Sequence, residues 1–318
     1  MHHRPLGNTG LSASIAALGC GGPSRLGLRT GHDEAHAASI VDLAISLGVN
    51  LIDTAESYGT EPAVGRAVKH HDRSKLIIAT KKSVKRPGPF QAVANQPQDN
   101  TEDAWQRRHD ARPFLTPALL RKGLEHSLRR LGTDYIDIYF LHAPLPHEID
   151  HAAETLFPEM DKLRDEGKLR FIAVSEMFAA DTSHQMLQRA RTLPASPGID
   201  VVMVGFNMLN QSARETIFAP TTQDRRTENG GRAGDGRGGW GVLNMFTVRK
   251  ALQSPPKMLE YLEKHAPAAG PGAHAGGAGK VVRAITEHPA FTTLPDVAYR
   301  FAAPDLDHRG NLLELLCA

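Results

Sequence analysis

Residues 51–60, LIDTAESYGT, run from an apolar segment through Asp53 into a polar turn that contains Tyr58. An amphipathic helix pattern precedes this stretch at 33–47, where apolar residues recur on one face. A second helix pattern follows at 61–71, with a proline in its first turn, where a missing N–H costs little. A short buried strand between two helices predicts a βαβ unit in a parallel sheet.

The alternation of strand and helix patterns continues along the chain. Strand patterns cover 12–19, 50–54, 75–80, 135–142, 169–175, 201–206 and 241–246, and further helix patterns cover 116–131, 157–166 and 181–192. Strands that are each followed by a helix or an insert predict a TIM (β/α)8 barrel. A doubly wound dinucleotide-binding fold fits less well, because GCGGPSRLG at 19–27 has Ser24 where the G-x-G-x-x-G motif has its third glycine.

Three segments fit neither pattern. Residues 83–114 are polar and contain prolines, and residues 221–239 and 266–279 are rich in glycine. We expect all three to be inserts in a single barrel of residues 1–303, not linkers between domains. Because inserts after barrel strands lie at the catalytic end, the first is either a lid or a disordered ornament.

The composition is that of an ordinary globular protein. The 318 residues carry a net charge of +2, and the two cysteines, Cys20 and Cys317, provide no disulfide framework, so we expect a reducing compartment. The start has no apolar leader, and no later stretch is long enough to span a membrane. We therefore expect a cytoplasmic protein, a monomer or weak oligomer, with no membrane partner. The sequence has no basic stripe with interleaved aromatic residues, so we expect no nucleic-acid partner.

Polar residues stand at the C-terminal ends of four consecutive predicted strands, where barrel enzymes build their active sites. They are Asp53 with Tyr58 in the next loop, Lys81 beside Lys82, His142, and Ser175 followed by Glu176. Taken singly, each has a structural interpretation: Asp53 as a turn former, Tyr58 as a surface aromatic, the lysines as solvated charges, and His142 as a structural histidine whose hydrogen bonds are made within the protein. Their joint placement after consecutive strands predicts a functional site.

A carboxylate, a lysine, a phenol and a histidine in one pocket form a proton-transfer site. A free tyrosine titrates near 10, too high for easy exchange at neutral pH. A nearby ammonium lowers that value, and a carboxylate holds the ammonium in place. The phenol can then protonate a carbonyl oxygen while hydride reaches the carbon, and the histidine can orient the same oxygen.

The sequence resembles the aldo-keto reductase family through the block DTAESYG at 53–59, followed by Thr80-Lys81 and by His142 after a leucine. Other matching segments lie at 4–21, 43–59, 77–83, 124–144, 163–177 and 200–210. The resemblance implies a TIM barrel that uses NADPH, with NADH as the alternative, and a catalytic tetrad of Asp53, Tyr58, Lys81 and His142. Lys81 takes the lysine position, not Lys82, because the family's lysine directly follows a threonine. In this scheme Tyr58 is the general acid, Asp53 and Lys81 tune it, and His142 orients the carbonyl.

The resemblance also implies where the nicotinamide binds. The family commonly has Ser-Asn after the fifth strand, and the pair here is Ser175-Glu176. An ionised glutamate can accept a hydrogen bond from the carboxamide but cannot donate one. Met203 stands where strand six usually has a glutamine, and Met245 where strand seven has a ring-stacking aromatic. The cofactor contacts implied are therefore Asp53, Ser175, Glu176, Met203 and Met245, with an altered grip on the carboxamide.

The C-terminal segment departs from the family pattern. After the helix pattern at 296–303 the family continues with an eighth strand and a loop that binds the 2′-phosphate, whereas residues 304–318 read PDLDHRGNLLELLCA. Either the eighth strand is absent, which leaves unpaired backbone groups at an open edge, or LLELLCA fills its place irregularly. We favour the first alternative.

These patterns predict an NADP(H)-dependent enzyme that reduces a small aldehyde or ketone, or in reverse oxidises a sugar or alcohol. The alternative is a catalytically weak or inactive barrel that binds nucleotide or a protein partner, which Glu176 and the atypical tail favour. A metal-dependent hydrolase fits poorly, because no H-x-H motif ends a strand and the histidines are scattered. These scattered residues are His109, His126, His142, His147 and His151.

Overall fold

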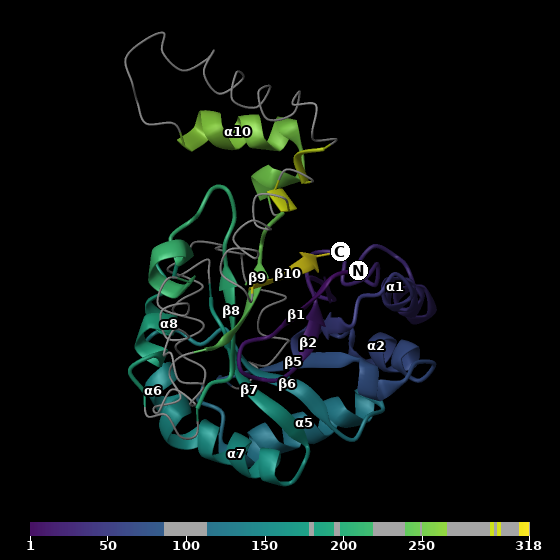
Figure 1. The fold of residues 1–318 in the computed structure, drawn as a ribbon, viewed down its shortest axis with the longest axis vertical. Helices are drawn as coiled ribbons and strands as arrows, with labels where there is room; N and C mark the ends of the chain where they lie inside the picture. Colours follow the sequence, from purple (N-terminus) through teal and green to yellow (C-terminus); the bar gives the residue numbers. More distant parts are fainter. Residues whose placement is uncertain are drawn as a thin grey trace, which may run out of the picture.

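The computed structural model describes residues 1–85, 113–177, 181–193, 198–218, 239–248, 250–265, 293–295, 298–299 and 312–317 (Figure 1). Within these residues, parallel strands close a barrel in the order β10-β3-β4-β5-β6-β7-β8-β9. The strands are β3 (Ala16–Gly19), β4 (Leu51–Asp53), β5 (Ile77–Ser83), β6 (Ile136–His142), β7 (Leu169–Ser175), β8 (Val201–Gly205), β9 (Gly241–Met245) and β10 (Leu312–Cys317). The predicted TIM-barrel fold is confirmed.

Helices surround this barrel and follow the predicted alternation. They are α1 (Glu34–Ser46), α2 (Glu61–Val68), α5 (Pro117–Leu131), α7 (Phe157–Asp165) and α8 (Gln185–Ala190). A further helix, α10 (Pro255–His265), was not predicted from the sequence. The side chain of Asp33 caps α1 by accepting a hydrogen bond from His36 N, and Thr116 caps α5 by accepting from Leu119 N. Gly132 ends α5 in the left-handed region at φ 63°. Local capping therefore sets these boundaries, and α1 and α5 begin close to the starts of the predicted helix patterns at 33–47 and 116–131.

Short helical segments connect the main elements. They are η1 (Glu56–Tyr58), η2 (Arg73–Lys75), α6 (Ile149–His151), the π-helical η3 (Ala152–Leu156) and η4 (Arg214–Phe218), and η5 (Lys250–Gln253). Segment η1 follows β4 directly, and its last residue is Tyr58. This single turn determines where the predicted catalytic phenol lies.

The strand predicted at 12–19 is divided in two. Residues Ser12–Ser14 form β2, which pairs antiparallel with β1 (His3–Pro5), and β3 begins only at Ala16. The hydroxyl of Ser14 donates to Ala16 O at 2.7 Å, and Ser14 N donates to Asn50 Oδ1 at 2.7 Å. Such local side-chain bonds compete with a continuous strand and bend the chain between the two pieces.

The eighth barrel position is occupied by β10. Its residue Leu312 pairs with Val242 of β9, and Cys317 pairs with Gly19 of β3, both in parallel. These pairings lie where the sequence left two alternatives, an absent eighth strand or an irregular segment in its place. The predicted helix at 296–303 and the insert at 83–114 lie largely outside the described residues. The insert at 266–279 lies entirely outside them, as does the insert at 221–239 except for its last residue.

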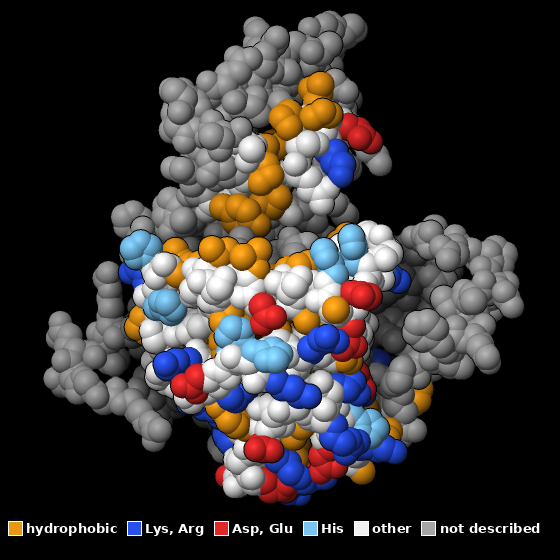
Figure 2. Space-filling view, turned by 90° about the vertical axis from the view of Figure 1, so that its right-hand side faces the viewer, with side chains coloured by type: hydrophobic (Ala, Val, Ile, Leu, Met, Phe, Trp, Pro, Cys, Tyr) orange, Lys and Arg blue, Asp and Glu red, His pale blue; other side chains and the backbone are white. Residues whose placement is uncertain are grey.

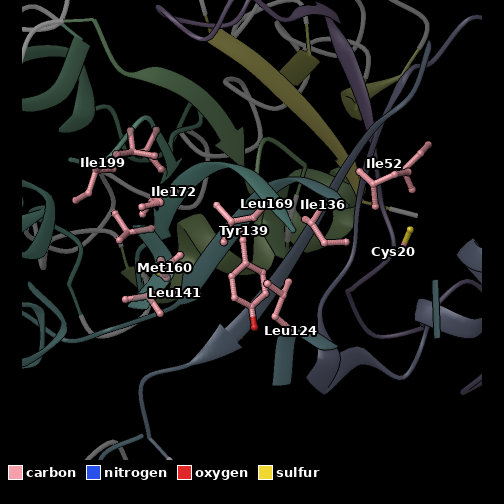
Figure 3. Packing of buried hydrophobic residues seen from close by; sticks show 14 of the residues in the cluster. Cys20, Ile52, Leu124, Ile136, Tyr139, Leu141, Met160, Leu169, Ile172 and Ile199 are labelled. Carbon is pink, nitrogen blue, oxygen red and sulfur yellow. The ribbon is translucent and has the colours of Figure 1, made fainter. Parts of the chain in front are cut away.

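Two apolar layers result from the alternation of side chains along each strand. The interior cluster fills the barrel with Leu6, Leu11, Ala13, Ala17, Leu51, Ile77, Ala79, Ile138, Phe140, Ala173, Val201, Met203, Leu243 and Met245. The outer layer joins the opposite faces of the strands to the helices, as with Tyr139 of β6 and Leu124 of α5 (Figure 3). The β1–β2 hairpin contributes Leu6, Leu11 and Ala13 to the interior cluster, so it covers the end of the barrel opposite the predicted site.

Helix α10 stands apart from the ring of helices and belongs to a smaller cluster (Figure 1). Its residue Met258 packs with Leu252, Leu294 and Ala298, and Met208 from the loop after β8 lies against them. On the face shown in Figure 2, acidic and basic side chains are mixed over the body, and hydrophobic ones gather toward its upper end. None of the helices described here has both the length and the apolar composition needed to cross a bilayer.

Candidate active site

Asp53, Lys81, His142 and Ser175 lie on the inner side of the barrel at the C-terminal ends of their strands. On β5 the interior cluster holds Ile77 and Ala79, so the alternation brings Lys81 to the same side. The same period brings His142 inward after Phe140 of β6, and Ser175 inward after Ala173 of β7. The register pairs His142 with Ser175 across β6 and β7, so these two side chains are neighbours at one level.

Asp53 and Lys81 form a buried ion pair. The Nζ atom of Lys81 donates to Asp53 Oδ1 and to Thr54 O, the latter at 2.9 Å, and the Lys81 side chain is 1% exposed. Burial raises the pKa of Asp53, against the opposing effect of Lys81. Burial also acts to lower the pKa of Lys81, but the charge of Asp53, together with Tyr58, leaves that pKa raised. The ammonium is therefore held in its charged form between the carboxylate and the phenol.

Lys82, the other candidate, has a different environment. Its ammonium pairs with Glu56, and its chain lies so close to α5 that a Cβ on Gly123 would lie 3.0 Å from Lys82 Cε. It therefore points outward from the strand while Lys81 points inward. The structure thus brings Lys81, not Lys82, to Asp53.

Tyr58 reaches the same inner site from the turn after β4. Its hydroxyl lies 3.4 Å from His142 Nε2, and the two rings meet edge to face at 82° with centroids 5.5 Å apart. Lys81 Nζ lies 5.2 Å from the centre of the Tyr58 ring. Gly21 after β3 leaves room for this ring, since a Cβ there would come within 2.8 Å of Tyr58 Cε2. Asp53, Tyr58, Lys81 and His142 are thus adjacent.

His142 is neutral at physiological pH. Burial lowers its pKa to about 3, and the positive charges of Lys81 and Arg25 act in the same direction. A neutral imidazole carries one N–H donor and one acceptor, and which nitrogen is protonated follows from its neighbours. His142 can therefore donate a hydrogen bond to a substrate oxygen without itself carrying charge.

The cofactor contacts implied on β7, β8 and β9 are more apolar. The hydroxyl of buried Ser175 accepts a hydrogen bond from Ala143 N at 3.1 Å, and Ala143 has the left-handed φ of 53°. Met203 and Met245 are 3% and 7% exposed and belong to the interior cluster. At this part of the site, Ser175 therefore offers a hydroxyl proton, and Met203 and Met245 offer apolar thioether surface.

Glu176 is engaged elsewhere. One carboxylate oxygen accepts from Gly205 N at 2.5 Å, and the other lies 2.7 Å from His184 Nδ1. His184 Nε2 in turn lies 2.8 Å from Ser212 Oγ. Burial, the largest effect, raises the pKa of Glu176, although the contact with His184 opposes it. Both oxygens therefore join β7 to β8 and to the N-terminus of α8, and the structure does not bring them to Tyr58.

One residue of the site was missed by sequence reasoning. The guanidinium carbon of Arg25 lies 4.6 Å from the centre of the Tyr58 ring, and its charge contributes to the low pKa of His142. Arg25 belongs to the GCGGPSRLG loop, which sequence reasoning tested only as a phosphate-binding motif. A cation in a loop that follows a barrel strand was the available signal. Among the described residues, no group of three potential ligands is arranged to hold a metal ion.

Comparisons with known proteins agree with this geometry. The sequence pattern of the Aldo/keto reductase family matches residues 17–227. The chain is 28% identical over 214 residues to D-threo-aldose 1-dehydrogenase of Pseudomonas sp, covering 64% of this chain and 61% of that protein. It is 29% identical over 234 residues to aldo-keto reductase YhdN of Bacillus subtilis (strain 168), covering 71% and 60%. The chain thus spans about six-tenths of the length of these two relatives.

A solved structure also superposes on the whole chain. The aldo/keto reductase from Klebsiella pneumoniae, in complex with NADP and acetate, aligns with a TM-score of 0.62 at 18% identity. The alignment covers 100% of this chain and 86% of that one, which establishes a shared fold. With a family pattern that covers most of the barrel strands and a matching fold, this chain belongs to the aldo/keto reductase family.

Proposed function

We propose that this protein is an NADP(H)-dependent oxidoreductase that reduces a small aldehyde or ketone to an alcohol, or oxidises an alcohol or sugar in reverse. The observation that carries the proposal is the contact of four groups at one rim. Tyr58 O–H faces His142 Nε2 at 3.4 Å, and the buried Lys81–Asp53 pair lies beside the phenol. This is the arrangement that proton transfer to a carbonyl oxygen requires.

The residues of the site fit a nicotinamide ring. The buried hydroxyl of Ser175 accepts from Ala143 N and keeps its own proton for a carboxamide oxygen. Met203 and Met245 offer apolar surface for the ring. The relative from Klebsiella pneumoniae, whose structure contains NADP, supports the choice of cofactor. When bound, the cofactor supplies the hydride.

The chain's own residues control the proton. A carbonyl oxygen placed between Tyr58 and His142 accepts the phenol proton, so the Tyr58 O–H bond breaks as the alcohol O–H bond forms. Lys81 stabilises the resulting phenolate, because an ammonium nearby favours the charged phenol. Asp53 keeps the ammonium in place, and neutral His142 donates a second hydrogen bond that orients the substrate. Each of the four groups therefore has a separate task.

Replacing Tyr58 tests this proposal. We expect Tyr58→Phe to lower kcat by about 10²- to 10⁴-fold, because a positioned proton donor contributes that much. NADPH consumption is measured over a panel of aldehydes, and NADPH binding is measured separately by titration. Tyr135→Phe is the matched control, because Tyr135 packs under Arg73, with the guanidinium carbon 4.0 Å from its ring centre and far from the rim. Equal consumption by wild type and Tyr58→Phe would show that Tyr58 is not the acid.

A second candidate function is nucleotide binding without turnover. It is favoured by the commitment of both Glu176 oxygens to Gly205 and His184, which leaves only Ser175 of the Ser175-Glu176 pair to contact the carboxamide. Tight NADPH binding with no consumption over the aldehyde panel supports this candidate, and normal turnover removes it. The cytoplasmic location and the monomer or weak oligomer stay predictions.

A further inference from the structure

Arg25 occupies a fixed position in the loop after β3. Arg25 and Leu26 have consecutive positive φ values of 54° and 57°, a conformation that costs energy for residues other than glycine. Leu26 is 1% exposed and packs in the outer apolar layer. On this anchored backbone, the guanidinium of Arg25 lies over the ring of Tyr58.

The guanidinium of Arg25 has few partners there. Its Nη1 reaches Ser57 O at 3.4 Å, a long contact, and its Nε is inaccessible to solvent with no hydrogen-bond partner in the described part of the chain. Burial lowers the pKa of Arg25, and the groups that act on it are Tyr58 and Arg29, with no carboxylate among them. A partly buried cation with an unsatisfied N–H is costly unless an acceptor reaches it.

The neighbouring cations differ from Arg25 in this respect. The ammonium groups of Lys81, Lys82 and Lys85 pair with Asp53, Glu56 and Glu148, respectively. Among the ion pairs of the described residues, none includes Arg25. The site therefore holds one cation whose natural complement is absent from the part of the protein that the structure describes. A planar guanidinium whose terminal nitrogens have no carboxylate partner among the described residues matches a carboxylate or phosphate group.

We propose that Arg25 is a specificity-determining residue that binds an anionic group of the carbonyl substrate, so that the preferred substrates are aldehydes or ketones bearing a carboxylate or phosphate. This rests on the proposed reductase function. The guanidinium of Arg25 lies against the ring of Tyr58, the proposed acid, and its charge acts on His142. We infer that an anionic group bound to Arg25 belongs to a substrate whose carbonyl oxygen lies between Tyr58 and His142. The pyrophosphate of the cofactor offers the same chemistry, and the experiment separates the two sources.

The test compares 4-carboxybenzaldehyde, which carries a carboxylate on the ring, with methyl 4-formylbenzoate, its neutral methyl ester. For Arg25→Gln we expect kcat/KM for the acid to fall about 10- to 100-fold, the range of a charge-assisted hydrogen bond, and that for the ester to change less than about threefold. Arg25→Lys keeps the charge without the fork and should lie between wild type and Arg25→Gln. Arg29→Gln, an exposed neighbour in the same loop, is the matched control and should leave both substrates unchanged.

Three results would overturn the proposal. Equal losses for acid and ester mean that Arg25 acts only through Tyr58, and no loss for either means that it has no role. A weaker affinity for NADPH in Arg25→Gln, measured by titration, with an unchanged ratio between acid and ester assigns the anion to the cofactor.

A binding measurement keeps the inference separate from turnover. In a thermal unfolding series with NADPH present, benzoate should raise the Tm of wild type and of Arg29→Gln, and should raise that of Arg25→Gln much less. If no aldehyde is reduced but this difference is seen, the proposed reductase function fails while the anion site stands. If benzoate shifts wild type and Arg25→Gln equally, the anion site fails whatever the enzyme reduces.

Discussion

The ends of β4, β5 and β6 carry ionisable side chains that contact one another, whereas the ends of β7, β8 and β9 carry one hydroxyl and two thioethers. In the first region Asp53, Lys81 and His142 surround the phenol of Tyr58. In the second region the acid that the sequence offers, Glu176, turns away to Gly205 and His184. In the proposed mechanism the first region moves the proton and the second supports the nicotinamide ring. One barrel rim is thus divided into a reacting half and a supporting half.

The same physical rule produces the difference in both halves. Side chains alternate between the two faces of a strand, so of two adjacent polar residues the strand directs one inward and one outward. On β5 the rule sends Lys81 to Asp53 and Lys82 to Glu56. After β7 it leaves Ser175 inside and directs Glu176 to the neighbouring loop. Of two adjacent polar residues on a strand, one therefore faces the proposed site and the other contacts the surrounding structure.

The largest effect is expected for the inner lysine. Lys81→Met leaves Asp53 buried without its partner, and removal of one member of a buried pair costs about 3–5 kcal/mol of unfolding free energy. Lys82→Met breaks a more exposed pair with Glu56 and should cost about 1 kcal/mol or less. Urea unfolding of both variants measures the difference. Comparable losses in the two would contradict the division of the lysines between the two faces.

A double variant sharpens this result. Replacing both partners, as in Asp53→Leu with Lys81→Met, removes the unpaired charge, so stability should return toward that of wild type. Activity should stay lost, because the phenol then has no ammonium beside it.

The second effect concerns the pH dependence of stability. His142 stays neutral in the folded protein down to a pKa of about 3, whereas an unfolded histidine takes up a proton near pH 6.5. Between these values the unfolded state binds more protons, so stability falls as the pH falls. We expect wild type to lose up to about 1.4 kcal/mol per pH unit more than His142→Gln between pH 6 and 4.

Denaturant unfolding at several pH values measures this slope. His147→Gln, at an exposed position in the following loop, is the control and should follow wild type. Parallel curves for wild type and His142→Gln would show that the imidazole is charged in the folded protein, and its role as a neutral donor would have to be abandoned.

The smallest effect is expected in the supporting half. Glu176→Ala leaves the N–H of Gly205 and the ring of His184 without an acceptor, which should cost about 1–3 kcal/mol of stability. NADPH affinity should change less than about threefold, because the carboxylate does not line the inner face. Glu215→Ala, an exposed acid in η4, serves as the control. A tenfold weaker NADPH affinity with unchanged stability would instead support the carboxamide contact that the sequence predicts for Glu176.

Much of this fold could be predicted because its signals are local. The helices that begin after Asp33 and Thr116, and the seven apolar strands, follow from the periodicity of neighbouring residues. The β1–β2 hairpin was missed because the bend after Ser14 depends on its bond to Asn50, which is remote in sequence. The pairing of β10 was left as the less favoured of two alternatives, because it depends on contacts with β3 and β9, which are distant along the chain.

The sequence alone determined that a carboxylate, a phenol, an ammonium and an imidazole follow consecutive strands, since each strand end is a local signal. The choice of Lys81 over Lys82 came from the family resemblance, but the sequence did not determine that Glu176 turns away from the site or that Arg25 lies over Tyr58. Those outcomes depend on strand register, on backbone strain at Arg25 and Leu26, and on contacts between segments far apart in the chain. Local patterns specify which chemical groups are available, and the tertiary structure decides which of them meet.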